Sequence, residues 1–248
     1  MINALKAEFR KLLSVRSTYI LISVAILFVI FFTFYIEGYH LSGKDLLNKH
    51  LYNDDIVGAL TSLPLIFGAI IAILLMTHEY RYNTITYSLT LSNSRSKVLA
   101  AKLIVTSVFA LLFTIAIAVL APVMSYLGIH MHGTTLVPQE LHLSSIAWRA
   151  LFEGWGYITI ALMWAVIVRN QIAAIVAIFA IPTIEQVLGL LLKHNSVYLP
   201  YISLNGVLQA PDPRLGAITY TRAAIVFIAY LVVGWIIAWI LFLRRDAS

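Results

Sequence analysis

Six separate stretches of this chain are each long and apolar enough to cross a lipid bilayer. A helix needs roughly 20 apolar residues to span the hydrocarbon core, because each residue advances it by only about 1.5 Å. The stretches lie near residues 17–36, 56–77, 98–128, 147–168, 171–192 and 222–243. Of the 248 residues, 61% are hydrophobic and only 11% are charged, which is typical of polytopic membrane proteins. The sequence therefore predicts an all-α membrane protein with six transmembrane helices in one domain, residues 1–248.

The first apolar stretch follows an amphipathic segment at the N-terminus. The apolar residues that share about 100° of arc on a helical wheel are Ile2, Leu5, Phe9, Leu12 and Leu13. Such a helix lies in the plane of the lipid headgroups, although a simple anchor at the start of the span explains the same pattern. The run that follows is longer than the core of a signal peptide and lacks a small-residue cleavage site. We expect an interfacial helix over 1–16 and a retained first span.

Basic residues near the span ends are unevenly divided between the two sides of the membrane. Eleven of the 17 lysines and arginines would share the side of the N-terminus: Lys6, Arg10, Lys11, Arg16, Arg81, Arg95, Lys97, Lys102, Arg169, Arg244 and Arg245. Cytoplasmic loops carry the excess of basic residues in membrane proteins. We therefore expect both termini in the cytoplasm of a plasma membrane, most simply the bacterial inner membrane.

The polar stretch between the second and third spans, residues 78–97, then also faces the cytoplasm. Asn83 can cap a short helix over about 84–91, on which Ile85 and Leu89 stand four residues apart and share one face. A short amphipathic helix between two spans suits docking to a soluble partner. A plain interfacial loop, whose tyrosines and bases anchor the span ends, fits the same residues.

This stretch resembles the segment that joins the second and third spans in permeases of ABC-2-type exporters. That family has a pattern like E-Y-R-x-G-T-I, followed by T/S-L, S-R and A-K. The matching residues are Glu79, Tyr80, Arg81, Thr84, Ile85, Ser88-Leu89, Ser94-Arg95 and Ala101-Lys102. Asn83 replaces the usual Gly and Asn93 a common Pro, but Asn also adopts left-handed backbone conformations.

By this resemblance the stretch is a coupling helix that contacts an ATPase. The implied coupling residues are Glu79, Tyr80, Arg81, Thr84, Ile85, Leu89 and Arg95, with Glu79 and Arg81 as polar couplers and Ile85 and Leu89 as the apolar contact. Residues 1–16 become the family's elbow helix. Both polar couplers are expected beyond the end of the span, in water.

The resemblance also implies partners. Six spans make half of a pathway, so we expect a second permease, either a second copy or a homologue, and two separate ABC ATPase subunits. ATP and Mg²⁺ would bind those subunits, and this chain would hold no cofactor of its own. The family exports drugs, antimicrobial peptides and lipid-linked compounds, and the apolar spans do not choose among them.

Several other chemistries are disfavoured by the residues themselves. Residues 38–44 have the spacing of a phosphate-binding loop, but Asp45 follows where Mg²⁺-nucleotide binding needs Ser or Thr. No acid or cysteine completes a metal shell with His130, His132 and His142, and the absence of cysteine excludes thiol catalysis. The bases sit at span ends rather than on a stripe with stacking aromatics, which argues against nucleic acid. We expect no metal and no catalytic residue.

Two carboxylates lie inside predicted spans. Glu185 follows Pro182 by one turn on the fifth span, and Glu153 follows Arg149 by four residues on the fourth. Ionisable groups at such depth mark transport pathways, so both are pathway candidates. A rim ion pair with Arg149 is the alternative for Glu153, and contact with water of an outer vestibule is the alternative for Glu185.

Two other functions also fit the sequence, and one of them depends on these carboxylates. A proton-coupled secondary transporter could use Glu153 or Glu185 as a relay, although the inverted repeats typical of such proteins are not evident. A non-transporting membrane assembly or sensor subunit is a third interpretation. The outer loop over 194–221 contains Pro200, Pro211 and Pro213, and both a re-entrant helical segment and an ordinary surface loop fit it.

Overall fold

The computed structural model describes residues 2–39, 58–59, 63–82, 84–85, 94–131, 143–209 and 218–245, and every long regular element in these ranges is a helix. The elements are α1 (Ile2–Ser14), α2 (Arg16–Ile30) continued by the π-helix η1 (Phe31–Tyr39), α5 (Leu63–Arg81), α7 (Arg95–Met131), α8 (Leu143–Val168), α9 (Gln171–Leu192), the 3-10 helix η2 (Lys193–Tyr198), α10 (Pro200–Leu208) and α11 (Tyr220–Arg244).

Six segments are long and apolar enough to cross a membrane, which confirms the predicted all-α, six-span fold. They are Arg16–Ile36, Leu63–Arg81, Arg95–Met131, Ile146–Val168, Gln171–Tyr198 and Tyr220–Arg244. The second span ends at Arg81, about one turn later than the sequence led us to expect, so polar residues near 79 belong to its last turn. The third is a 37-residue helix that continues through Pro122.

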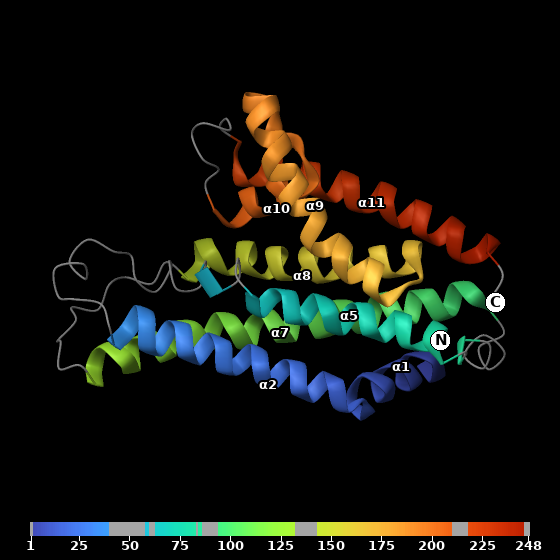
Figure 1. The fold of residues 1–248 in the computed structure, drawn as a ribbon, viewed down its shortest axis with the longest axis horizontal. Coiled ribbons are helices and arrows are strands. Elements are labelled where there is room, and N and C mark those ends of the chain that lie inside the picture. The colour runs from blue at the N-terminus through green and yellow to red at the C-terminus, as the bar shows by residue number, and fades with distance from the viewer. Residues whose placement is uncertain are drawn as a thin grey trace.

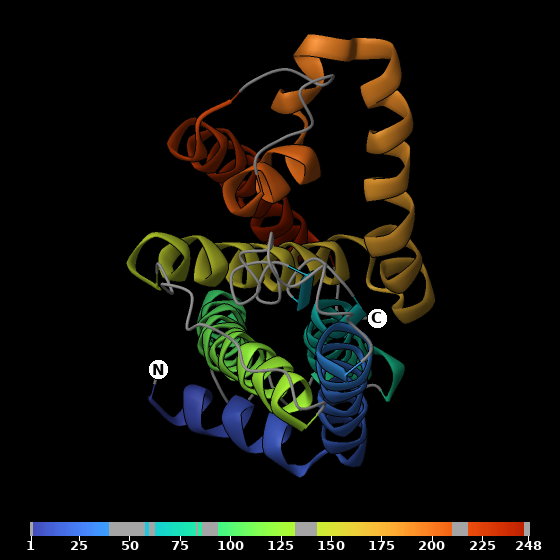
Figure 2. The same cartoon turned by 90° about the vertical axis from the view of Figure 1, so that its left-hand side faces the viewer.

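Helix α8 is the centre of the bundle. It packs against α5 and α7 on one side and against α9, α10 and α11 on the other (Figure 1). Seen along the bundle, α1 and α2 lie on the far side of α5 and α7 from α8 (Figure 2). Gly154 and Gly156 on α8 allow its neighbours to approach closely, because glycine has no side chain to hold them apart.

The two glycines face different neighbours. A Cβ at Gly154 would lie 1.9 Å from Oγ1 of Thr114 on α7, and one at Gly156 would lie 2.7 Å from the ring of Phe227 on α11. Neither position has room for a methyl group. Membrane helices often pack closely through small residues. Lipid is as apolar as the side chains, so the helices gain from close van der Waals packing rather than from the hydrophobic effect.

The segment after α9 folds back between α9 and α11. The chain turns through η2 and returns as α10, which starts with Pro200 at its first position and packs against α8, α9 and α11 (Figure 2). Helix α9 itself stands away from the bundle, with Leu190 74% and Leu191 75% exposed. Apolar side chains so exposed are compatible with lipid as the surrounding solvent.

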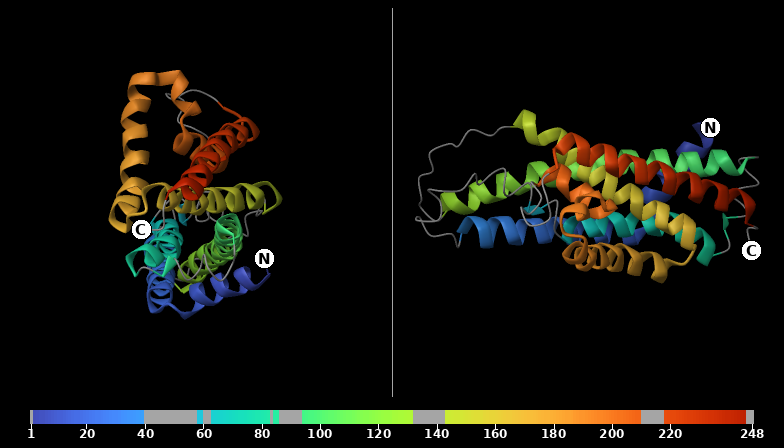
Figure 3. Two further views of the ribbon diagram at one scale, coloured as in Figure 1. Left: turned by 90° about the vertical axis from the view of Figure 1, so that its right-hand side faces the viewer. Right: turned by 90° about the horizontal axis from the view of Figure 1, so that it is seen from above.

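The N-terminal helix and the C-terminal end of α11 lie at the same end of the bundle (Figure 3). The end of α5 and the start of α7, which flank residues 82–94, lie there too (Figure 1). This arrangement follows from an even number of spans. That this end is cytoplasmic stays a prediction from the basic residues.

Candidate functional site: an ion cluster beside the coupling segment

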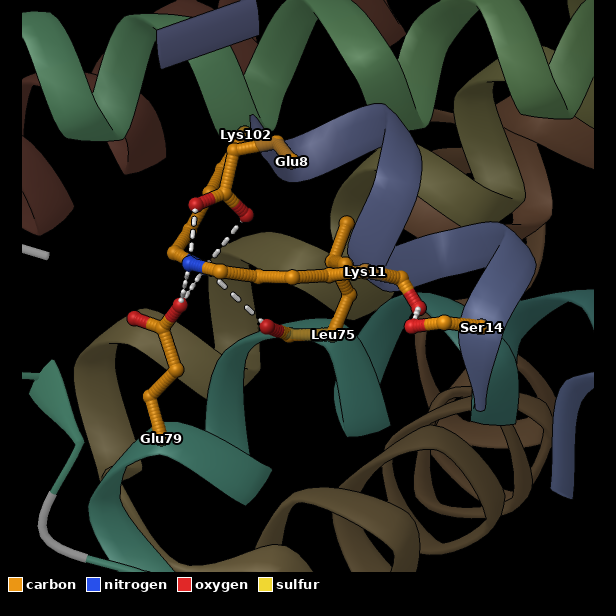
Figure 4. Close-up of polar contacts among 6 residues, drawn as sticks. All are labelled: Glu8, Lys11, Ser14, Leu75, Glu79 and Lys102. Carbon is orange, nitrogen blue, oxygen red and sulfur yellow. Dashed lines mark hydrogen bonds and ion pairs between the residues drawn. The ribbon is translucent and has the colours of Figure 1, made fainter. Parts of the chain in front are cut away.

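Lys102 is the centre of the candidate site. It lies on α7, is 0% exposed, and has one of the largest fully buried side chains of the described residues. Its Nζ contacts Oε2 of Glu8 at 2.8 Å, Oε1 of Glu79 at 2.9 Å and the carbonyl oxygen of Leu75 at 3.1 Å (Figure 4). An ammonium group has three protons to donate. All three therefore have acceptors, which is what allows a lysine to be buried.

Lys11 completes a closed set of two acids and two bases. Its Nζ donates to Oε1 of Glu8 at 2.7 Å and also to Glu79, so both carboxylates contact both ammonium groups (Figure 4). Burial by itself would lower the pKa of Lys11, but the carboxylates of Glu79 and then Glu8 outweigh it and raise that pKa above its ordinary value. Glu8, Lys11, Glu79 and Lys102, which we call the junction cluster, thus carry no net charge.

The junction cluster joins three elements that are far apart in sequence. Glu8 and Lys11 stand three residues apart on α1 and so share a helix face. Glu79 comes from the last turn of α5, and Lys102 from the second turn of α7. Losing one partner of a buried ion pair typically costs about 3–5 kcal/mol, because the remaining charge is buried without compensation. The cluster therefore fixes where α1, α5 and α7 meet.

The expectation that Glu79 stands in water beyond the span is wrong. Helix α5 continues to Arg81, and this extra turn carries Glu79 into the cluster, where it is 4% exposed. Arg81, in contrast, is exposed as expected, and its guanidinium lies 5.7 Å from the ring centroid of Tyr82. Of the two expected polar couplers, only Arg81 is open to a partner.

Ile85, one of the two residues expected to form the apolar contact with an ATPase, is buried within this chain. Thr84 is exposed, but Ile85 is only 2% exposed, so its side chain packs inside this chain instead of projecting toward a partner. Leu89 lies outside the described residues, as does most of the expected helix over 84–91. The role of these residues in ATPase contact stays a prediction.

Residues 82–94, between α5 and α7, are called the coupling segment from here on, and its far end is joined to α11. Nη1 of Arg95, the first residue of α7, donates to the carbonyl oxygens of Leu243 at 3.3 Å and Arg245 at 2.7 Å. Nη1 of Arg245 in turn donates to the carbonyl oxygen of Ile167 near the end of α8, at 2.8 Å. These carbonyls belong to helix C-terminal ends, which lack partners within the helix and attract positive charge.

Tyr80 connects α5 to the turn between α8 and α9. The guanidinium carbon of Arg169 lies 5.1 Å from the centroid of the Tyr80 ring. Arg169 has a left-handed backbone, with φ of 58°, which allows α8 and α9 to be separated by only two residues. Asn170 then caps α9 by accepting a hydrogen bond from the backbone N–H of Ala173 at 3.1 Å.

The chain matches the family model of ABC-2 family transporter proteins over residues 4–193. This range is more than half of the chain, and it contains every residue of the junction cluster. The chain belongs to the ABC-2 transporter family. It is therefore a multi-pass membrane protein and a transmembrane subunit of a transporter. No curated protein matches the chain.

In this ABC-2 family member, Glu185 has a structural partner. It is 5% exposed, and its Oε2 accepts hydrogen bonds from the backbone N–H groups of Tyr201 at 2.7 Å and Ile202 at 3.2 Å. These groups open α10, where the helix dipole favours a negative charge. Glu185 therefore caps the returning helix from α9. Its role in a pathway stays a prediction.

The expected ion pair between Arg149 and Glu153 is absent among the described residues. The guanidinium of Arg149 lies instead 4.3 Å from the ring centroid of Tyr220, at the start of α11. Glu153 is 1% exposed, and its Oε2 has no hydrogen-bond partner in the part of the chain that the structure describes. The pairing prediction failed because helical spacing shows which residues share a face but not which neighbour, here an aromatic ring, competes for one of them.

Sequence reasoning missed the partners of Glu8 and Lys102. A signal was present, because Lys102 lies inside an apolar run, and an ionisable residue in such a run requires a buried counter-charge. The described ranges contain no group of three or more His, Cys, Asp or Glu side chains able to hold a metal ion. His132 and His142 lie outside those ranges.

Proposed function

We propose that this chain is the transmembrane subunit of an ATP-driven exporter and that the junction cluster passes the movement of the coupling segment to the spans. The observation that carries the proposal is the position of Glu79. It lies in the last turn before the coupling segment, and its carboxylate bonds to α1 through Lys11 and to α7 through Lys102. A displacement at the end of α5 would therefore move three elements together.

The opposite end of the segment supports the same mechanism. Arg95 begins α7 and bonds to the end of α11, which Arg245 links to the end of α8. Both ends of the segment are thus attached to other helices by polar contacts. The contacts of Glu79 are buried and resist separation because their loss leaves uncompensated charges, whereas the contacts of Arg95 and Arg245 are exposed and weaker. An ATPase pressing on residues 82–94 would act on a connected framework.

The partners follow from family membership. ABC-2 permeases typically work with ATPase subunits, so we propose two such subunits, which bind ATP and Mg²⁺, and a second permease, either identical or homologous. In this arrangement the present chain is not an enzyme. The coupling segment and both termini face the cytoplasm. The substrate is hydrophobic or amphipathic, in keeping with the drugs, antimicrobial peptides or lipid-linked compounds that such permeases export.

A proton-coupled secondary transporter is the second candidate, because Glu153 in the central helix is a buried carboxylate, one oxygen of which lacks a partner in the described ranges. Such groups serve as proton relays in membrane transporters. The two candidates differ in their energy source. The first needs a separate ATPase, whereas the second needs only this chain and a proton gradient.

The test begins with affinity purification of the tagged chain from its native membranes in mild detergent. We expect an ABC ATPase to co-purify, and the complex to hydrolyse ATP while the chain alone does not. The Arg81→Glu variant should lower the amount of co-purified ATPase, whereas Arg222→Glu, which changes an exposed arginine at the opposite end of the bundle, should not. Movement of a fluorescent amphipathic dye driven by a pH gradient, in vesicles that contain this chain and no ATP, would contradict the proposal.

A further inference from the structure

A cavity of about 520 Å³ lies between the α1–α2 corner and α5, next to the junction cluster. Its volume is within the range of roughly 300–1,000 Å³ that is typical of small-molecule sites. It is bounded by Leu12 and Val15 on one side and by α5 on the other. The cavity reaches Tyr82 and Thr84, the first residues beyond α5, so anything bound there also contacts the start of the coupling segment.

The lining changes from apolar to polar along α5. Ile71, Leu74 and Leu75 form its deep part, whereas His78 and Tyr82 lie nearer the end of the bundle. From Ile71 to His78 the helix advances by about 10 Å, since each residue contributes about 1.5 Å. The apolar part therefore lies deeper in the predicted membrane than the polar part. A molecule with an alkyl chain and a polar head would match this order.

The polar end of the cavity favours a negatively charged head. Lys11 lines it with a side chain that is 37% exposed, and the exposed Arg81 lies close enough to His78 of the lining to act on it electrostatically. Arg16, also exposed, follows the lining residue Val15 in the chain. Lys11 and Glu79 of the lining are bonded to each other within the neutral junction cluster, so the excess positive charge at this end comes from Arg81 and Arg16. The inner leaflet of a membrane carries anionic lipids, to which basic residues near the surface are attracted.

We propose that this cavity binds an anionic phospholipid, with an acyl chain against Leu74 and Leu12 and the phosphate near Lys11 and His78. The lipid lies between the N-terminal helix and the second span, where it fills space that no side chain of the described residues occupies. Because it touches both the junction cluster and the start of the coupling segment, it is part of the structure that ATPase movement would displace. This site does not depend on which energy source drives transport.

The test uses the full-length chain, without any ATPase, in vesicles of phosphatidylcholine and phosphatidylglycerol. The probe is phosphatidylglycerol with a diazirine near the end of one acyl chain. After illumination and proteolysis, we expect labelled peptides from α5 around Ile71–Leu75 and from the α1–α2 corner. Unlabelled phosphatidylglycerol should reduce this labelling by about tenfold at an excess that phosphatidylcholine cannot match.

The Leu74→Trp variant fills the cavity and should remove most of this labelling. Val15→Trp fills it from the opposite wall and serves as a second variant if the first does not fold. Ile172→Trp, on an exposed face of α9 at the same end of the bundle, is the matched control and should leave the labelling unchanged. Thermal unfolding of each variant in detergent verifies that it is folded.

Two results would overturn the proposal. Labelling spread over all exposed helix faces, and insensitive to Leu74→Trp and Val15→Trp, would mean that the lipid only surrounds the protein. Equal competition by phosphatidylcholine would mean that the cavity does not recognise an anionic head. Because no ATPase or substrate is present, neither result bears on the proposed export function.

Discussion

Single residues matter most in this protein where a charge is buried. Lys102 is held by two carboxylates and a carbonyl oxygen, and Glu185 is held by two backbone N–H groups. The ammonium group of Lys102 has several acceptors, and the carboxylate of Glu185 has two donors. Such partners allow a charge to be buried without a large loss of stability. Glu153, one oxygen of which has no hydrogen-bond partner among the described residues, departs from this rule.

Replacing Lys102 should destabilise the protein strongly. The change Lys102→Met leaves Glu8 and Glu79 with only Lys11, so we expect a loss of about 3–5 kcal/mol in the free energy of unfolding. The double variant Lys102→Met with Glu8→Gln restores the charge balance and should recover part of this loss. Thermal unfolding in detergent measures both. Lys97→Met, at an exposed position on the same helix, is the control and should change little.

Removing the carboxylate of Glu185 should loosen the start of α10. In Glu185→Ala the N–H groups of Tyr201 and Ile202 lose their acceptor, at a cost of about 1–2 kcal/mol. Glu185→Gln keeps one acceptor oxygen and should cost less. Hydrogen exchange followed by mass spectrometry should show faster exchange at 201–202 in the alanine variant. Unchanged exchange there would show that Glu185 does not cap the helix, and would return attention to a pathway role.

At the scale of elements, α8 organises the bundle because its neighbours approach it at glycine. Gly154 admits Thr114 of α7, and Gly156 admits the ring of Phe227 on α11. At the end that carries the termini, α11 is held to α8 by Arg245, and α9 is held to it by the short turn at Arg169. Elements are therefore positioned by close backbone packing in the middle and by charged contacts at one end.

A methyl group at position 154 should separate α7 from α8. The added Cβ would lie 1.9 Å from Oγ1 of Thr114, so we expect Gly154→Ala to cost about 1–3 kcal/mol through overpacking. Adding Thr114→Ala removes the nearest atoms and should recover part of the stability. At Gly206 the nearest atoms would be 3.6 Å away, so Gly206→Ala should be neutral or stabilise α10. Comparable losses at both glycines, measured by thermal unfolding, would contradict this account.

At the scale of the molecule, both chain ends and both ends of the coupling segment gather at one end of the bundle (Figure 3). The segments η2 and α10 lie away from this end, against α9 and α11 (Figure 1). This polarity suits a transporter subunit that receives movement on one side and responds on the other. The basic residues predict that this end faces the cytoplasm.

Single cysteines can establish this orientation without background, because the chain has no cysteine. A membrane-impermeant maleimide applied to intact cells should label Ser42→Cys and Thr134→Cys. The variants Ser92→Cys and Ser248→Cys should react only after the membrane is permeabilised. Labelling of Ser92→Cys in intact cells would reverse the orientation and remove the basis for ATPase docking at the coupling segment.

The sequence by itself determined the class of fold and most of its boundaries. Six apolar runs of spanning length can satisfy their backbone hydrogen bonds in lipid only as helices, so their number and order follow from hydropathy. The pattern from Glu79 to Lys102 likewise indicated the ABC-2 family, whose model the chain matches. These inferences succeed because they depend on local composition and on residues adjacent in the chain.

Only the tertiary structure decided which polar residues meet. Glu8 and Lys102 are 94 residues apart, and no spacing rule could pair them. The burial of Glu79 depends on one extra turn of α5, and the pairing of Arg149 with Tyr220 depends on where α11 begins. The physical reason is common to all three. A polar group withdrawn from water takes the partner that packing brings within reach, and packing is a property of the whole bundle.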